Sequence, residues 1–254
     1  MTKSICVRLL PAFIQPNDTQ GKCVVMTDVL RASTTIIQAT AGGVTAVHPV
    51  AEIEDALKLR DQLPEGTLIG GERGGEIVPG FNCGNSPREY TTETVTGKAL
   101  VLCTSNGTYT LDFCRGADRI LIGAFANLSA VSDELLKHEH CLVACAGTNR
   151  KLTGEDILFA GAVVDQLLIK NPEIELDTGA QIAWAFWNSS VSRIDSGTTS
   201  LAEIFAGECV GGVNLIKLGY DADVEFCAQI DRTPIVPELN EKSWSITLSK
   251  TDEA

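Results

Sequence analysis

The chain has 254 residues, of which 44% are hydrophobic and 21% are charged. This length and composition are typical of a soluble globular protein with one large α/β unit or two small lobes. The formal net charge of −13 argues against a nucleic-acid partner, because such a partner requires basic stripes that this chain lacks. An acidic protein that handles an anionic substrate must instead supply local positive charge from arginines, helix amides or a bound cation.

The sequence contains no run of about 18 apolar residues, so we expect no membrane-spanning helix and no membrane partner. Its first residues alternate apolar and polar side chains at Ile5, Val7 and Leu9 and lack the long apolar core of a signal peptide. We therefore expect a cytoplasmic protein. The nine cysteines are odd in number and form no C-x-x-C pair, so we expect neither a disulfide framework nor a structural zinc site.

Strands and helices alternate over the first 170 residues, judged from apolar periodicity and from glycine and proline stops. The predicted strands cover residues 4–10, 23–26, 44–50, 67–70, 98–103, 119–123 and 141–145. The predicted helices cover residues 32–41, 51–63, 109–114, 128–136 and 156–170. This alternation is typical of an α/β fold with a mostly parallel or mixed sheet and helices on both faces, a three-layer α/β/α arrangement.

The C-terminal part of the chain is less regular. Residues 180–187 are apolar all round and predict a buried helix, whereas residues 200–206 and 221–228 predict amphipathic helices. Residues 235–237 predict a short edge strand or an extended tail. We expect a single compact unit over residues 1–254. Two lobes, of about residues 1–125 and 126–254, that share one active-site cleft stay an open alternative.

The most informative stretch is residues 26–35, where a buried strand is followed by a polar loop and the start of a helix. It contains the carboxylate of Asp28, the guanidinium of Arg31 and the hydroxyls of Ser33 and Thr34. Open α/β proteins place their chemistry at such strand ends. A carboxylate can hold a divalent cation, an arginine can clamp a phosphate, and the amides of a helix start can bind an anion.

Two further strands end in similar polar turns. Because the carboxyl ends of parallel strands lie on one rim of the sheet, we expect Asp28, Thr104 and Thr148 to approach one crevice. The glycine-rich loop of residues 71–88 is long for a compact domain, and such loops are usually either functional or disordered. Its apolar residues, which include Phe81, favour a functional loop.

Each candidate residue also has an interpretation without a catalytic role. Asp28 could be only a charge at a helix N-terminus, and Asn106 could belong only to a tight turn. Arg73 could be solvent-exposed, like many arginines in glycine-rich loops. Asp156 fits a helix capping box, but that motif gives no role to Glu155 next to it.

The known phosphate-binding motifs are incomplete or absent. The sequence contains no G-x-x-x-x-G-K-[ST] P-loop and no H-E-x-x-H zinc motif. Cys83 and Arg88 are separated by four residues, one fewer than the cradle of cysteine phosphatases requires. If the protein is an enzyme that acts on an anion, carboxylates and a hard cation must carry the chemistry.

Several motifs occur together in the order found in one family. They are DVLRASTT at 28–35, GERGG at 71–75, PGFNCGNSP at 79–87, TSNGT at 104–108, CAGT at 145–148, ED at 155–156 and a late signature within 218–237. The set resembles the 2-phosphosulfolactate phosphatase (ComB) family over nearly the whole chain. The chain departs from the usual family residues at Asn82, Cys83 and Ser105.

The resemblance implies an α/β phosphatase that depends on Mg²⁺. Such an enzyme removes phosphate from (2R)-2-phospho-3-sulfolactate and leaves 3-sulfolactate, a step in coenzyme M biosynthesis. We therefore expect Mg²⁺ as the cofactor and a small anionic phosphorylated substrate as the partner. Whether the protein forms a homo-oligomer stays open.

We assign hypothetical roles to the candidate residues on this basis. The catalytic residues are Asp28, Arg31, Glu72 and Arg73. The Mg²⁺ ligands are Asp28, Glu72, Glu155 and Asp156. The substrate-binding residues are Ser33, Thr34, Asn85, Ser86, Thr104, Asn106, Gly107, Thr108 and Gly147. Whether water or a side chain attacks phosphorus stays open, with Ser33, Ser86 and Cys145 as candidate nucleophiles.

Two other functions stay open. The protein could bind a sulfonated or phosphorylated acid without catalysis, as a binding protein or sensor. It could also be a hydrolase or lyase that acts on another small phosphorylated acid. Phosphate release from a panel of such acids, with Mg²⁺ and with EDTA, distinguishes the three.

Overall fold

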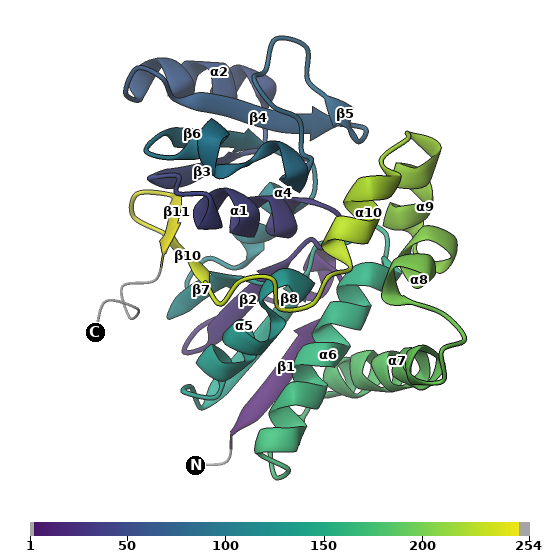
Figure 1. Ribbon diagram of the computed structural model, residues 1–254. Helices are drawn as coiled ribbons and strands as arrows, with labels where there is room; N and C mark the ends of the chain where they lie inside the picture. The colour runs from purple at the N-terminus through teal and green to yellow at the C-terminus, as the bar shows by residue number, and fades with distance from the viewer. Residues whose placement is uncertain (1–2, 249–254) are drawn as a thin grey trace.

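The computed structural model describes residues 3–248, and its strands form a sheet of 11 strands with helices on both faces (Figure 1). In chain order the strands are β1 (Ser4–Arg8), β2 (Cys23–Thr27), β3 (Ala46–Val50), β4 (Leu68–Arg73), β5 (Glu76–Ile77), β6 (Ala99–Cys103), β7 (Arg119–Ile122), β8 (His140–Cys145), β9 (Glu175–Leu176), β10 (Pro237–Asn240) and β11 (Ser245–Leu248). Their order across the sheet is β5-β4-β6-β3-β11-β10-β7-β2-β8-β1-β9. The predicted three-layer α/β/α fold is therefore confirmed.

Helices connect most of these strands. They are α1 (Ala32–Ala41), α2 (Ile53–Gln62), α3 (Thr92–Val95), α4 (Gly107–Phe113), α5 (Leu128–Leu135), α6 (Gly154–Lys170), α7 (Thr178–Asp195), α8 (Leu201–Glu208), α9 (Val210–Lys217) and α10 (Asp221–Cys227). The described residues also form three short 3₁₀ helices, which are η1 (Pro11–Phe13), η2 (Pro87–Glu89) and η3 (Phe125–Asn127).

The sheet consists of two parallel blocks that run in opposite directions. Strands β4, β6 and β3 form the first block, and β7, β2, β8, β1 and β9 form the second. The hairpin of β10 and β11 lies between the blocks and pairs antiparallel with β7 on one side and β3 on the other. The three successive pairings of β3 with β11, β11 with β10 and β10 with β7 are all antiparallel, so the second block runs antiparallel to the first.

Helices α1 and α4 pack against both blocks. Ile37 of α1 and Leu111 of α4 belong to one buried cluster that also contains Met26 of the second block and Leu100 of the first. The other face of the second block packs against α5, α6, α7 and α8, and the other face of the first block packs against α2. Figure 1 shows α1 and α4 at the centre of the molecule, where the two blocks meet.

The ends of strands from both blocks meet beside these helices. Asp28 and Thr148 follow β2 and β8 of the second block, whereas Asn106 follows β6 of the first block, and all three line one cavity. The strand ends therefore approach each other from opposite directions, rather than along the rim of one parallel sheet as expected. The inserted β10–β11 hairpin is the cause, because it reverses the direction of the first block.

The C-terminal part differs most from the expected elements. Residues 235–237 were predicted to form a short edge strand or an extended tail. Residues 235 and 236 belong to no strand, and Pro237 begins β10, which is not an edge strand because it lies inside the sheet and pairs on both sides. The helix expected at 180–187 is longer and is not buried all round, because Ile182 is 50% exposed and Phe186 is 39% exposed. Helix α9 and strand β11 have no counterpart among the predicted elements.

Strands from both sides of residue 125 alternate within the second block, since β7 and β2 precede that residue and β8 follows it. The division into two lobes stays a prediction. In the part of the chain from residue 3 to residue 248, no helix combines the length and apolar character needed to cross a membrane.

Candidate active site

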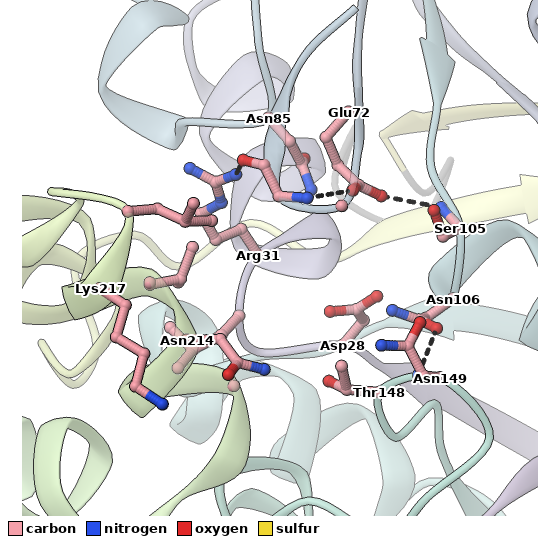
Figure 2. Close-up of a pocket in the computed structure, with 16 residues that line it drawn as sticks. Asp28, Arg31, Glu72, Asn85, Ser105, Asn106, Thr148, Asn149, Asn214 and Lys217 are labelled. Carbon is pink, nitrogen blue, oxygen red and sulfur yellow. Dashed lines mark hydrogen bonds between the residues drawn. The ribbon is translucent and has the colours of Figure 1, made fainter.

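A cavity of about 310 Å³ lies where the two blocks meet (Figure 2). Four charged side chains line it, those of Asp28, Arg31, Glu72 and Lys217. Its polar lining also includes Asn85, Ser105, Asn106, Thr148, Asn149 and Asn214. A concave site of this size with a few convergent polar groups is typical of small-molecule binding.

Asp28 follows β2 and is 6% exposed. The amide of Ala32, at the start of α1, donates to its carboxylate. Burial, and then the charges of Asp156, Glu72 and Glu155, raise the pKa of Asp28 well above its ordinary value. None of the ion pairs among residues 3–248 includes Asp28. Its carboxyl group therefore lies in the cavity wall without a cationic side chain to neutralise it.

Gly107 allows the start of α4 to lie against Asp28. A Cβ atom at this position would lie 2.9 Å from the Cβ of Ala32 and 3.2 Å from Oδ2 of Asp28. Both distances are shorter than ordinary contacts, so a side chain there would push α4 away from the β2 loop. Gly107 thus contributes to the site by having no side chain.

Glu72 connects two loops of the first block. Its Oε1 accepts a hydrogen bond from the amide of Ser105 at 2.9 Å, and its Oε2 accepts one from the amide of Gly75 at 2.8 Å. The first amide belongs to the loop after β6 and the second to the turn between β4 and β5. Figure 2 shows the Glu72 carboxylate above Asp28 in the same cavity.

Asp156 lies behind the cavity and holds the loops after β2 and β8 together. Its Oδ1 accepts the amide of Val29 at 2.8 Å, and its Oδ2 accepts the amide of Gly147 at 2.8 Å and the hydroxyl of Thr153 at 3.2 Å. The expected capping box is not formed, because Thr153 makes no side-chain cap hydrogen bond. Burial raises the pKa of Asp156 to about 6, although these hydrogen bonds oppose the shift.

Glu155 contacts the start of α9. Oε1 of Glu155 would lie only 1.8 Å from a Cβ atom at position 211, so the glycine is required for this approach. Its Oε2 is buried without a hydrogen-bond partner among the described residues. Burial, and then the charge of Asp156, raise the pKa of Glu155 to about 8. Neither Glu155 nor Asp156 lines the cavity.

Arg31 joins three parts of the molecule and is 2% exposed. One terminal nitrogen forms an ion pair with Asp223 of α10 at 2.8 Å, and the other donates to the carbonyl of Gly75 at 2.5 Å. Its Cζ lies 4.3 Å from the centre of the Tyr220 ring. Asp223 also accepts a hydrogen bond from Ser86 at 2.6 Å. Asp223 therefore orients Arg31 at the cavity wall, while Ser86 lies outside it.

Arg73 lies away from this cavity. Its guanidinium donates to the carbonyl of Glu72 at 2.8 Å, to the carbonyl of Ala51 and, at 3.2 Å, to the sulfur of Cys103. The side chain borders a separate surface hollow with Ile53 and residues 76–79. The described contacts thus hold Arg73 between β4 and the loop before α2.

Five of the expected substrate-binding residues lie behind the cavity wall with partners of their own. The hydroxyl of Ser33 accepts the amide of Asp28 at 2.8 Å, and Thr34 donates to a main-chain carbonyl at 2.9 Å. The hydroxyls of Thr104 and Thr108 lie 3.1 Å apart. The remaining one, Gly147, donates its amide to Asp156. These residues shape the loops around the site.

The three candidate nucleophiles are also outside the lining. Ser33 and Ser86 are buried and hydrogen-bonded. Cys145 is fully buried, and burial raises the pKa of its thiol well above the usual value, so the thiolate is disfavoured. These placements favour water as the attacking group.

The asparagines of the expected set do line the cavity. Oδ1 of Asn106 accepts the amide of Asn149 at 3.1 Å, which leaves its side-chain NH₂ group available as a donor. Oδ1 of Asn85 is buried and has no hydrogen-bond partner among the described residues. An unpartnered buried acceptor at a cavity wall is costly unless a ligand, an ion or water satisfies it.

Helix α9 supplies a wall that was not expected from the sequence. Asn214 and Lys217 are three residues apart and therefore share a helix face, and both line the cavity opposite Asp28 and Thr148 (Figure 2). Neither forms a side-chain hydrogen bond or ion pair within residues 3–248. The adjacent glycines 211 and 212 were the available signal, since glycine inside a helix marks a close approach to a neighbour.

The oxygen groups around Asp28 suit a hard cation better than a soft one. No group of three or more His, Cys, Asp or Glu residues in the described chain is arranged to hold a metal ion. Mg²⁺, however, is commonly bound through one or two carboxylates and several waters. Asp28 and Glu72, which both line the cavity, fit this pattern.

Sequence comparisons identify relatives over most of the chain. The family model described as 2-phosphosulpholactate phosphatase matches residues 9–242. A protein of Thermotoga petrophila described as a probable 2-phosphosulfolactate phosphatase is 40% identical over 218 residues, which are 86% of this chain and 89% of that protein. A protein of Carboxydothermus hydrogenoformans with the same description is 37% identical over 222 residues, 87% of either chain.

Proposed function

Because the chain belongs to the 2-phosphosulfolactate phosphatase family, we propose that it hydrolyses (2R)-2-phospho-3-sulfolactate with Mg²⁺ as its cofactor. Water attacks phosphorus, the bond between phosphorus and the ester oxygen breaks, and 3-sulfolactate and inorganic phosphate are released. We place this reaction in coenzyme M biosynthesis and in the cytoplasm. The observation that carries the proposal is the buried, unneutralised carboxyl group of Asp28 in a cavity lined by hydrogen-bonding groups.

Asp28 and Glu72 are the residues that would hold Mg²⁺, with water filling the other positions. When bound, the ion neutralises the carboxylates, polarises the phosphoryl oxygens and orients the attacking water. Asp156 and Glu155 lie outside the cavity lining and position the elements that carry the site. Asp156 fixes the loops after β2 and β8 through two amides, and Glu155 fixes the start of α9.

Positive charge for the phosphate comes from two side chains of the cavity. Arg31 keeps N–H groups beyond those that bind Asp223 and Gly75. Lys217 carries a mobile ammonium on the opposite wall. Arg31 is buried and held by Asp223 and Gly75, so its charge is preorganised at the cavity wall, where it acts more strongly than in bulk water. Lys217 is exposed and adds a second positive charge at the rim.

Neutral donors complete the contacts to the substrate. The side-chain NH₂ of Asn106 is free to donate because its oxygen already accepts the amide of Asn149. The side chains of Thr148 and Asn214 face the same space (Figure 2). Such fixed donors stabilise the charge that develops on the phosphoryl oxygens.

A phosphate-release assay over a panel of small phosphorylated acids tests the proposal. We expect hydrolysis of (2R)-2-phospho-3-sulfolactate with Mg²⁺, loss of activity in EDTA and recovery when Mg²⁺ is restored. Binding of this compound without release under any divalent cation would instead indicate a binding protein. Faster turnover of a different phospho-acid would indicate a different hydrolase.

A further inference from the structure

A second chamber of about 190 Å³ adjoins the main cavity. Ser105, Asn106 and Asn149 belong to the lining of both, so the two spaces share a wall at the loops after β6 and β8. The remaining lining combines apolar residues near η1 with Tyr109 of α4 and Arg150.

The second chamber differs from the main cavity in the charges of its lining. Among the described residues, Arg150 is the one charged side chain in its lining, whereas two carboxylates and two cationic side chains line the main cavity. Within residues 3–248, no hydrogen bond or ion pair of the Arg150 side chain occurs, and its Cζ lies 5.1 Å from the centre of the Tyr109 ring. Tyr109 is in turn held by an edge contact with Phe113, with ring centres 5.0 Å apart. In a chain of net charge −13, this unpaired arginine marks a local site for an anion.

The backbone at Arg150 gives a second, independent observation. Thr148 and Lys151 exchange two main-chain hydrogen bonds of 3.0 Å across a two-residue turn. Both central residues have positive φ, 51° for Asn149 and 59° for Arg150, as in a type I′ turn. Asparagine tolerates this conformation, but a long side chain such as arginine does so at a cost that glycine would avoid. Strain of this kind is concentrated at functional positions.

We propose that the second chamber binds the sulfonate of the substrate, with Arg150 as its counter-charge, while the phosphate occupies the main cavity. This inference rests on the proposed function. The planar guanidinium, backed by the Tyr109 ring, presents several N–H donors to a group with three oxygens. Asn106 and Asn149 line both spaces, so their side chains can contact both anionic groups. Arg150 is therefore a specificity-determining residue.

The test compares two substrates in three proteins. The substrates are (2R)-2-phospho-3-sulfolactate and 2-phospholactate, which keeps the phosphate and carboxylate but lacks the sulfonate. The proteins are the unaltered chain, Arg150→Gly, and Lys151→Ala as a control that removes one positive charge from the next residue. Lys151 is exposed and lines neither space.

For Arg150→Gly we expect the KM for the sulfonated substrate to rise about tenfold or more with little change in kcat, because a charge-assisted contact is lost. The KM for 2-phospholactate should stay unchanged, and Lys151→Ala should leave both values unchanged. An equal rise for both substrates would overturn the assignment, because the chamber would then bind the carboxylate. Unchanged KM values would also overturn it.

Calorimetric binding of 3-sulfolactate separates this inference from the proposed function. If the unaltered protein releases no phosphate from either substrate, the proposed function fails. The role of Arg150 is then decided by whether 3-sulfolactate binds more weakly to Arg150→Gly than to Lys151→Ala. Equal affinity would overturn it. The melting temperature of Arg150→Gly should be no lower than that of the unaltered protein, since glycine relieves the strained turn.

Discussion

At the scale of single residues, Arg31 and Asp223 form a buried pair that is 192 positions apart in sequence. Both side chains are 2% exposed, so each charge depends on the other for its solvation. Ser86 adds a hydrogen bond to the second oxygen of Asp223. Through this pair and the hydrogen bond of Arg31 to the carbonyl of Gly75, α10 and the turn between β4 and β5 hold Arg31 at the cavity.

The substitution Asp223→Asn tests this pair. It keeps the shape of the side chain but leaves the guanidinium of Arg31 buried without a counter-charge. We expect a loss of about 3 kcal/mol in the free energy of unfolding, measured by urea denaturation, and a lower kcat/KM. Asp221→Asn, an exposed position in the same helix, is the matched control and should change neither quantity. Equal stability of the two variants would contradict the role given to Asp223.

Sequence reasoning located some of these residues and missed others for a physical reason. Asp28, Glu72 and Asn106 were predicted because a strand end or a glycine-rich loop marks a site locally. Asp223 was not predicted, since its partner is distant in sequence and a charged helix start explains it equally well. Ser33 and Thr34 were expected to contact substrate, but their hydroxyls satisfy main-chain groups of the same loop. Sequence alone does not show which way a hydroxyl points.

At the scale of elements, α9 forms the wall of the cavity that carries Asn214 and Lys217. Its position depends on Gly211, which lies against the carboxyl group of Glu155. The helix was not predicted because its eight residues contain two glycines, which weaken any helical pattern. The same glycines allow the close contact that places the helix at the site.

Gly211→Ala tests the contact between α9 and Glu155. The new Cβ would overlap Oε1 of Glu155, so we expect a lower melting temperature and a higher KM, because Asn214 and Lys217 shift with the helix. Gly207→Ala in α8 is the control, because a Cβ there meets nothing within 4 Å. Alanine is the better helix former, so this control should be as stable as the unaltered protein or more stable. A Gly211→Ala protein with unchanged melting temperature and KM would contradict the close contact.

At the scale of the whole molecule, the three-layer fold was predictable because strands and helices alternate along the chain. The opposite direction of the two blocks was not predictable, because it is set by a hairpin of four-residue strands near the C-terminus. One of these strands has no counterpart among the expected elements. The site nevertheless forms near the expected strand ends, since α1 and α4 pack against both blocks.

The buried acids make the stability of the whole molecule depend on pH. Burial raises the pKa of Asp28, that of Asp156 to about 6 and that of Glu155 to about 8, from ordinary values of 3.8 to 4.5. Between about pH 4.5 and pH 8 the folded chain therefore keeps protons that the unfolded chain releases. By proton linkage, the stability that these three acids contribute must fall as pH rises through this window. The lowered pKa values of His48 and His138 act in the opposite direction.

Calorimetry in EDTA at about pH 5 and about pH 8 checks this expectation. We expect the melting temperature to be lower at the higher pH, and Glu155→Gln to reduce the difference by removing the group that titrates last. Added Mg²⁺ should raise the melting temperature more at the higher pH, where the carboxylates are deprotonated and bind the ion best. A Glu155→Gln protein whose melting temperature changes with pH as in the unaltered protein would contradict the shift assigned to Glu155.

The central claim is that Asp28 holds the cation on which phosphate release depends. The most direct measurement is kcat/KM for (2R)-2-phospho-3-sulfolactate as a function of Mg²⁺ concentration in Asp28→Asn. The control is Asp112→Asn, whose carboxylate is 52% exposed and pairs with Arg115 on the outer side of α4. We expect Asp28→Asn to lose activity at least about a hundredfold, because several kcal/mol of charge stabilisation depend on the ion, and Asp112→Asn to behave as the unaltered protein. Full Mg²⁺-dependent turnover by Asp28→Asn would contradict the claim.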